Sequence, residues 1–219
     1  MKTLHSRTLL TMLTGLLVFA PVVHAKKEQR TQPVISLQGK VERYLINPFG
    51  EVDGLFLNNG KLVKIPPHMS GDVTELAKPG DGVVVQGTPE IGPGFEAYSV
   101  TNTASNRTLL RREPVWNGKV MPKQMRAAEL KEISASGKIE QIITGKRGEP
   151  QIIILENGTN VRLPKDTANG AYALMSVGAP FSANGFGTEN QYGRSLEASA
   201  IGATPASLKP LFGAFGPPH

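Results

Sequence analysis

Short apolar stretches bounded by turn residues fill most of residues 34–201 and predict strands rather than long helices. In the first half, strands are expected at Val34–Ile46, Val52–Leu57, Leu62–Ile65, Val83–Gly87 and Phe95–Asn102. A short helix is expected between the third and fourth strands, because Ser70 can cap a segment that runs to about Ala77. The Asn59-Gly60 pair predicts a tight hairpin turn between the second and third strands.

The same pattern returns 98 residues later in the chain. Gly39-Lys40-Val41-Glu42 aligns with Gly137-Lys138-Ile139-Glu140, and the register slips by three residues before Glu96-Ala97 aligns with Glu197-Ala198. The second set of strands is expected at Ile133–Thr144, Pro150–Leu155, Val161–Leu163, Ala179–Gly185 and Ser195–Ile201, with a helix near Ala171–Met175. A fixed spacing that changes only at a loop indicates two copies of one small fold.

The element order predicts an all-β protein of two tandem OB-like barrels. Each copy has the order β-β-β-α-β-β, which is typical of a small five-stranded, partly open barrel. Such a barrel needs a strongly curved first strand, and Gly39 and Gly137 lie inside the strands that must bend. The alternative is a pair of SH3-like barrels, which lack a helix at this place.

Several short motifs of the first copy support this interpretation. They are Gly39-x-Val41, Asn47-Pro48-x-Gly50-Glu51-Val52-Asp53-Gly54, Asn59-Gly60, Pro66-Pro67-His68 and Pro79-Gly80-Asp81. The pattern resembles uncharacterised exported OB-fold proteins of Gram-negative bacteria. The resemblance covers both repeats but not the connecting segments, and it implies a fold without implying an activity. The second copy departs from the pattern at Gly145, Lys146, Gln151, Lys165 and Asp166.

The N-terminus is expected to be a signal peptide, residues 1–25. Lys2 and Arg7 give it a basic start, Thr8–Ala20 is apolar, and small residues surround a cleavage point after Ala25. A membrane anchor is the alternative, but the apolar run is shorter than the ~20 residues that cross a bilayer. A periplasmic or secreted protein without an integral membrane segment is therefore expected.

The remaining boundaries follow from the repeat. We expect a flexible arm at 26–33, OB-like domains at 34–103 and 133–201, a basic linker with Trp116 at 104–132, and a flexible Gly/Pro tail at 202–219. The net charge of +6 lies outside the domains, because residues 34–103 carry five basic and eight acidic side chains whereas 104–132 carries seven and three. With no cysteine, each domain depends on its own apolar core.

Catalytic chemistry is not expected. Only His68 and His219 remain after signal cleavage, so no domain has more than one histidine and no general acid–base pair can be proposed. No P-loop or dinucleotide-binding glycine motif is present. A metal site would need His68 together with loop carboxylates such as Asp53, Asp72 or Asp81, which are more often solvated turn residues. We therefore expect no enzyme activity, no cofactor and no metal.

Binding is the expected class of function. OB barrels bind ligands on strands two and three and on the adjoining loops, and in the first copy this surface includes Tyr44, Asn47, Phe49, Phe56, Lys61, Lys64 and His68. The equivalent positions in the second copy are Ile142, Gly145, Arg147, Ile154, Thr159, Arg162 and Asp166. The aromatic residues are confined to the first copy, although Tyr44 and Phe56 could instead be core residues.

Three functions remain open at this stage. The first is an exported, non-enzymatic binding protein whose ligand is a small molecule, a glycan or a protein of the periplasm. The second is a single-stranded nucleic-acid binder, which the fold suggests but the acidic first domain disfavours, because phosphate contacts need basic side chains. The third is a structural or interaction adaptor in which Trp116, Arg111 and Arg112 of the linker contact a partner or the neighbouring domain.

Overall fold

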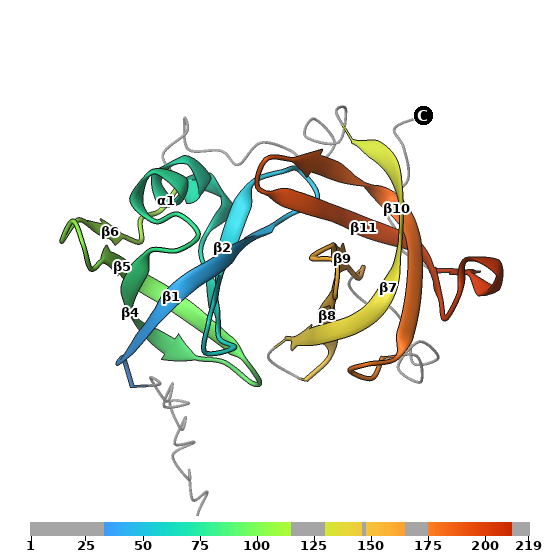
Figure 1. The fold of residues 1–219 in the computed structure, drawn as a ribbon, viewed down its shortest axis with the longest axis horizontal. Coiled ribbons are helices and arrows are strands. Elements are labelled where there is room, and N and C mark those ends of the chain that lie inside the picture. Colours follow the sequence, from blue (N-terminus) through green and yellow to red (C-terminus); the bar gives the residue numbers. More distant parts are fainter. Residues whose placement is uncertain (1–32, 115–129, 146–147, 165–174, 212–219) are drawn as a thin grey trace, which may run out of the picture. The chain divides into compact units, whose positions relative to one another are not determined.

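The computed structural model describes residues 33–114, 130–145, 148–164 and 175–211. The first half contains β1 (Ile35–Ile46), β2 (Val52–Leu57), β3 (Leu62–Lys64), the 3₁₀ helix η1 (Pro67–Met69), α1 (Ser70–Leu76), β4 (Gly82–Pro89), β5 (Gly94–Asn102) and β6 (Thr108–Leu110). The strand and helix order predicted for the first copy is confirmed (Figure 1). The predicted signal peptide, cleavage site and N-terminal arm up to residue 32 lie outside the described residues.

The first five strands close into a barrel. The long strand β1 pairs antiparallel with both β2 and β4, and a parallel pairing between β3 and β5 completes the ring. The predicted bend of β1 is present as register shifts between Val41 and Arg43 and between Leu45 and Ile46, both just after Gly39. The barrel is therefore of the expected OB-like kind, and the SH3-like alternative, which lacks the helix between β3 and β4, does not apply.

One barrel contact explains a glycine that both copies share. A Cβ added to Gly87 on β4 would lie 2.0 Å from the carbonyl oxygen of Glu96 on β5, and a Cβ added to Gly185 would lie 2.0 Å from the carbonyl oxygen of Glu197. Both glycines sit beside a register shift in the pairing of these strands. The repeated glycine thus permits a close backbone approach that any side chain would prevent.

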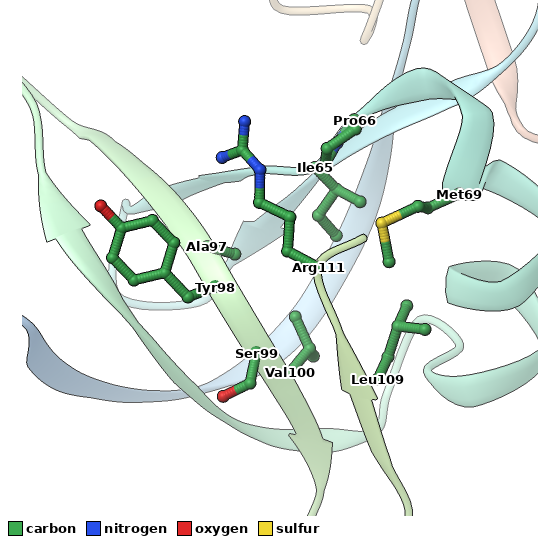
Figure 2. Close-up of a pocket in the computed structure, with 9 residues that line it drawn as sticks. All are labelled: Ile65, Pro66, Met69, Ala97, Tyr98, Ser99, Val100, Leu109 and Arg111. Carbon is green, nitrogen blue, oxygen red and sulfur yellow. The ribbon is translucent and has the colours of Figure 1, made fainter. Parts of the chain in front are cut away.

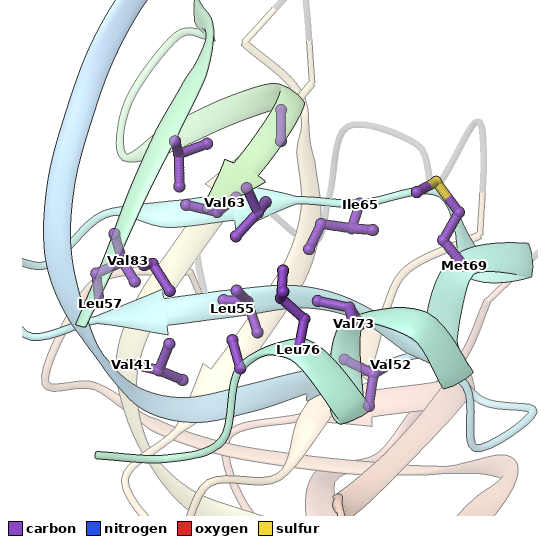
Figure 3. Packing of buried hydrophobic residues seen from close by; sticks show 14 of the residues in the cluster. Val41, Val52, Leu55, Leu57, Val63, Ile65, Met69, Val73, Leu76 and Val83 are labelled. Carbon is purple, nitrogen blue, oxygen red and sulfur yellow. The ribbon is translucent and has the colours of Figure 1, made fainter. Parts of the chain in front are cut away.

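The core of the first barrel is aliphatic and includes the helix. Val73 and Leu76 of α1 point between the strands and pack with residues such as Leu55, Val63 and Ile65 (Figure 3). Ser70 does not cap α1 as predicted: its side-chain oxygen instead accepts a hydrogen bond from the backbone N–H of Val52 at 2.8 Å. The hydroxyl therefore ties the start of the helix to β2 rather than stabilising the helix end.

The second barrel repeats this plan. It consists of β7 (Lys131–Thr144), β8 (Pro150–Leu155), β9 (Asn160–Arg162), β10 (Pro180–Asn190) and β11 (Gly193–Gly202), followed by η4 (Pro205–Ser207) and β12 (Lys209–Pro210). The strand β7 pairs with β8 and β10, and β9 runs parallel to β11, as in the first copy. The helix predicted near Ala171–Met175 falls almost entirely on residues that the structure does not describe.

Each copy also carries a sixth strand that the expected boundaries left out. Strand β6, which lies within the segment predicted as a linker, pairs antiparallel with β5, and β12, which lies within the predicted tail, pairs antiparallel with β11. Leu109 and Leu211 pack against the two cores. Strand β7 also begins at Lys131, two residues before its expected start at Ile133 and within the segment predicted as a linker.

Candidate functional site

The strand face predicted to bind a ligand is covered by the second barrel. Phe56 on β2 is only 3% exposed and belongs to an apolar cluster that is separate from both barrel cores. This cluster, called the interbarrel cluster below, contains Leu45, Phe56 and Leu62 of the first barrel and Ile143, Ile152 and Ile154 of the second. The guanidinium of Arg43 lies 4.7 Å from the centre of the Phe56 ring. The burial of Phe56 agrees with the alternative in which it is not a surface residue, and its contact with a ligand stays a prediction.

The two barrels meet through equivalent surfaces. Leu45 and Ile143 occupy matching positions of the repeat, as do Phe56 and Ile154, and all four belong to the interbarrel cluster. An interface built from the same patch on both sides is the intramolecular counterpart of a twofold dimer contact. The residues of both barrels accordingly belong to a single compact unit, residues 32–219.

The loops around the cluster make reciprocal contacts. The side chains of Thr188 and Asn190, at the end of β10, donate hydrogen bonds to the backbone oxygens of Pro48 and Gly50 at 2.8 and 2.9 Å. In the opposite sense, the hydroxyl of Thr144 at the end of β7 contacts the carbonyl oxygen of Ile91 at 3.4 Å. Each barrel thus contacts the other through two loops, one between strands one and two and one between strands four and five. In an OB fold these loops flank the ligand site.

Ion pairs between described residues of the two barrels include Arg43–Glu140 and Arg162–Asp53. Arg43 pairs with Glu140 at 2.7 Å, and both side chains are partly exposed. Arg162 donates two hydrogen bonds to the carboxylate of Asp53, at 2.8 and 2.6 Å, and the Asp53 side chain is only 11% exposed. Burial raises the pKa of Asp53 to about 6, and the opposing attraction of Arg162 offsets only part of this effect. Compared with a solvated aspartate, the buried carboxyl group of Asp53 therefore takes up a proton more readily.

Tyr44 is half-buried rather than displayed for a ligand. Its hydroxyl donates a hydrogen bond to the carbonyl oxygen of Ala77 at 3.0 Å, and its ring meets that of Tyr192 edge to face, with the centroids 5.5 Å apart. Desolvation raises the pKa of Tyr44, and Tyr192 and Asp81 add to the effect. Tyr44 therefore joins the first core to the second barrel.

The turn after β1 uses its polar residue internally. Asn47 is 5% exposed; its side chain donates a hydrogen bond to Glu51 at 2.7 Å and accepts hydrogen bonds from the backbone N–H groups of Phe49 and Glu51. The polar atoms of Asn47 are thus engaged within the turn, and its contact with a ligand stays a prediction. Phe49, which was placed on the same predicted surface, is half-buried.

The predicted basic residues are dispersed. Lys61 is exposed in the β2–β3 turn, whereas Lys64 pairs with Glu90 at 2.6 Å. His68 is exposed, and its Nε2 lies 2.8 Å from the backbone oxygen of Arg112. These three side chains belong to different local networks, so they do not form a common anion-binding surface.

The expected interdomain arginines bind their own barrel. Arg112 pairs with Asp72 at 2.6 Å, and Arg111 pairs with Glu96. The ion pairs of both arginines lie within the first barrel, and their contact with a partner or with the neighbouring domain stays a prediction. Trp116, the third residue of that prediction, lies outside the described residues.

An apolar hollow lies on the first barrel beside η1, β5 and β6 (Figure 2). Its lining comes from η1 and the preceding residues, from β5, and from β6 and the residue after it: Ile65, Pro66, Met69, Ala97, Tyr98, Ser99, Val100, Leu109 and Arg111. Tyr98 is 41% exposed, and Leu110 on β6 is 66% exposed. This region was not predicted because β6 falls in the segment expected to be a linker, although the apolar pair Leu109-Leu110 is a signal that could have revealed the strand.

Within the described ranges, no group of three or more metal-ligating side chains is present, and no helix has the length and apolar character needed to cross a membrane. His68 is the one histidine among the described residues. Comparisons of the chain with protein-family models, with curated proteins and with solved structures found no match. The fold and the surfaces described above are therefore the basis for inferring a function.

Proposed function

We propose that this chain is an exported, non-enzymatic binding protein whose first barrel engages a protein partner at the hollow beside β5 and β6. The observation that carries the proposal is the packing of the barrels against each other through the face that usually binds OB ligands, while the β5–β6 side presents an apolar surface to a partner. The apolar start of the chain and its small-residue cleavage point support export.

The size of the hollow favours a protein over a small molecule. Its cavity volume is about 10 Å³, roughly the space of one water molecule, whereas sites for small ligands usually occupy about 300–1,000 Å³. A partner would therefore bind across this surface, where the lining residue Tyr98 and the neighbouring Leu110 of β6 are exposed. Aromatic and aliphatic anchors of this kind carry much of the binding energy in protein interfaces.

A nucleic-acid ligand has less support. Stacking of bases needs accessible aromatic rings, but Phe56 is buried and Tyr44 is engaged with Tyr192. Fluorescence anisotropy with a labelled oligonucleotide at low salt should show no binding, and affinity that falls steeply as salt rises would revive this alternative.

Site-specific photo-crosslinking tests the protein-partner proposal in cells of the source organism. A photoreactive residue at Tyr98 should give a discrete adduct with one protein, whereas the same residue at the exposed Glu75 of α1 should not. The Leu110→Asp substitution in the Tyr98 background should abolish the adduct without changing the circular dichroism spectrum. Equal adducts at both positions, or none at Tyr98, would refute a binding surface at this hollow.

A further inference from the structure

The face that joins the barrels is complementary to itself in the first copy of the repeat. Arg43 of the first barrel pairs with Glu140 of the second at 2.7 Å, and Glu140 corresponds to Glu42 across the repeat spacing. If two first barrels met as the two barrels of one chain do, Arg43 of each copy would therefore meet Glu42 of the other. Because such a contact is twofold, the ion pair would form twice. Glu42 is exposed and makes no ion pair with another described residue.

The same face carries apolar side chains that depend on a cover. Leu45, Phe56 and Leu62 are at most 3% exposed, and all three belong to the interbarrel cluster rather than to the core of the first barrel. They would face water if the second barrel moved away. Contiguous exposed apolar surface on a soluble protein usually marks a protein contact. Two such faces can bury each other as the first face now buries the isoleucines of the second barrel.

The second barrel lacks this self-complementarity. The position that corresponds to the arginine of the first barrel is Gln141, so Glu140 would meet an amide instead of a cation if two second barrels paired. The position that corresponds to the aspartate is Gln151, so Arg162 would lose its carboxylate partner in the same contact. Charge therefore favours the pairing of two first barrels over the pairing of two second barrels.

Asp53 would keep a cation opposite it when two first barrels pair. The position that corresponds to Arg162 is Lys64, which pairs with Glu90 of its own barrel at 2.6 Å. A lysine ammonium has three donors, so Lys64 can bind Glu90 and the Asp53 carboxylate of a second copy together. One lysine shared by two carboxylates holds Asp53 less firmly than the two hydrogen bonds of Arg162 do. The second barrel of the same chain therefore has the advantage over a second copy.

We propose that this face of the first barrel is a self-association surface that the second barrel covers. Its residues are Glu42, Arg43, Leu45, Asp53, Phe56 and Leu62. A chain whose second barrel is displaced pairs with a second copy through the two first barrels, and a chain whose barrels are in contact does not. The surface is separate from the hollow beside β5 and β6, so the proposal does not depend on a partner at that hollow.

Two matched substitutions in the full chain expose one face at a time. Leu45 and Ile143 occupy equivalent positions, are each 1% exposed and lie outside the barrel cores. An aspartate at either position places a charge without a partner in the interbarrel cluster, which separates the barrels. Sedimentation velocity over a wide range of concentration should show a dimer for Ile143→Asp, whose first face is intact. The natural chain and Leu45→Asp should both sediment as monomers.

A charge exchange then tests the predicted contact. Adding Arg43→Glu to Ile143→Asp should raise the dissociation constant of the dimer about tenfold or more, because each copy loses an ion pair and gains a repulsion. Adding Glu42→Arg as well should restore the dimer. If circular dichroism shows that Ile143→Asp does not fold, Ile154→Asp disrupts the same cluster and must give the same dimer. A monomeric Ile143→Asp chain, equal dimerisation of Leu45→Asp, or a dimer unaffected by Arg43→Glu would overturn the proposal.

Discussion

The substitution Phe56→Ala should uncouple the barrels while leaving each one folded. Phe56 lies outside both barrel cores and contacts the second barrel through the interbarrel cluster. Truncation of a buried phenylalanine to alanine costs about 3–5 kcal/mol, and loss of the stacked Arg43 adds about 0.5–1 kcal/mol. A cost of about 4 kcal/mol is a large part of the stability of a typical domain, which is about 5–15 kcal/mol, and here it falls on the contact between the barrels.

The neighbouring residue provides the matched control. Leu57 follows Phe56 on β2, points to the opposite face and is fully buried in the core of the first barrel. Leu57→Ala should cost a comparable ~2–5 kcal/mol, but it acts on the first barrel itself. The two variants thus remove similar apolar volume from opposite sides of one strand.

Differential scanning calorimetry separates the two outcomes. The natural protein should unfold in one transition, because the barrels stabilise each other. Phe56→Ala should give two transitions, one for each barrel, whereas Leu57→Ala should shift the transition of the first barrel to lower temperature. The reasoning is falsified if Phe56→Ala leaves the transition unchanged or lowers it in the same way as Leu57→Ala.

Three further predictions follow from single contacts. Arg162→Ala should lower the free energy of unfolding by about 3–5 kcal/mol in urea at pH 7.5, because it leaves the ionised Asp53 carboxylate buried without a cation. This loss of stability should be smaller at pH 5, where Asp53 is more often protonated, and an equal loss at both pH values would contradict the reasoning. Gly87→Ala should prevent folding of the first barrel, since the new Cβ would lie 2.0 Å from a backbone oxygen, whereas Gly71→Ala has open space at its Cβ and should stabilise α1 by up to about 1 kcal/mol. Thermal unfolding monitored by circular dichroism distinguishes the two variants, and similar melting temperatures for both would contradict the packing around Gly87. Because the folded protein raises the pKa of Tyr44, stability should fall as pH rises above 10; Tyr44→Phe should reduce this fall in urea titrations at pH 9 and pH 11, and an unchanged fall would exclude Tyr44 as its source.

The sequence was sufficient to predict the two barrels because the repeat fixes the order of the strands. The aligned glycines and Asn-Gly turns mark the same loops twice, and the structure has the expected strands between them. The sixth strands were missed for a compositional reason: β6 follows a polar turn in a basic segment, and β12 contains a proline and lies in a region rich in glycine and alanine. Neither strand has the length that normally indicates one, and β12 has no β-branched residue.

The covered face could not be recognised from the first copy alone. A phenylalanine at position 56 that faces away from the core could contact a ligand, a partner protein or a second barrel. The residue type alone does not say which of these contacts it makes. The second copy carries the clearer signal, since Ile152, Ile153 and Ile154 form an uninterrupted apolar run on β8. Such a run indicates a strand buried on both faces, and its equivalence to β2 would have predicted that the first face is covered too. The Asp53–Arg162 pair joins residues 109 positions apart and depends on the mutual placement of the barrels, which no local pattern contains.

Because the two contacting barrels belong to one chain, each side of their interface can change independently, which is not possible in a dimer of identical subunits. In a homodimer, a substitution in the interface changes both subunits at once, so an acidic residue introduced on one side also appears on the other. Here the two sides are encoded separately, and they have diverged: Asp53 faces Arg162, while the corresponding positions carry Gln151 and Lys64. Gene duplication with fusion thus allows an asymmetric ion pair to evolve between two barrels of the same fold. Substitutions on the interface of one barrel are then constrained by the residues that they contact on the other.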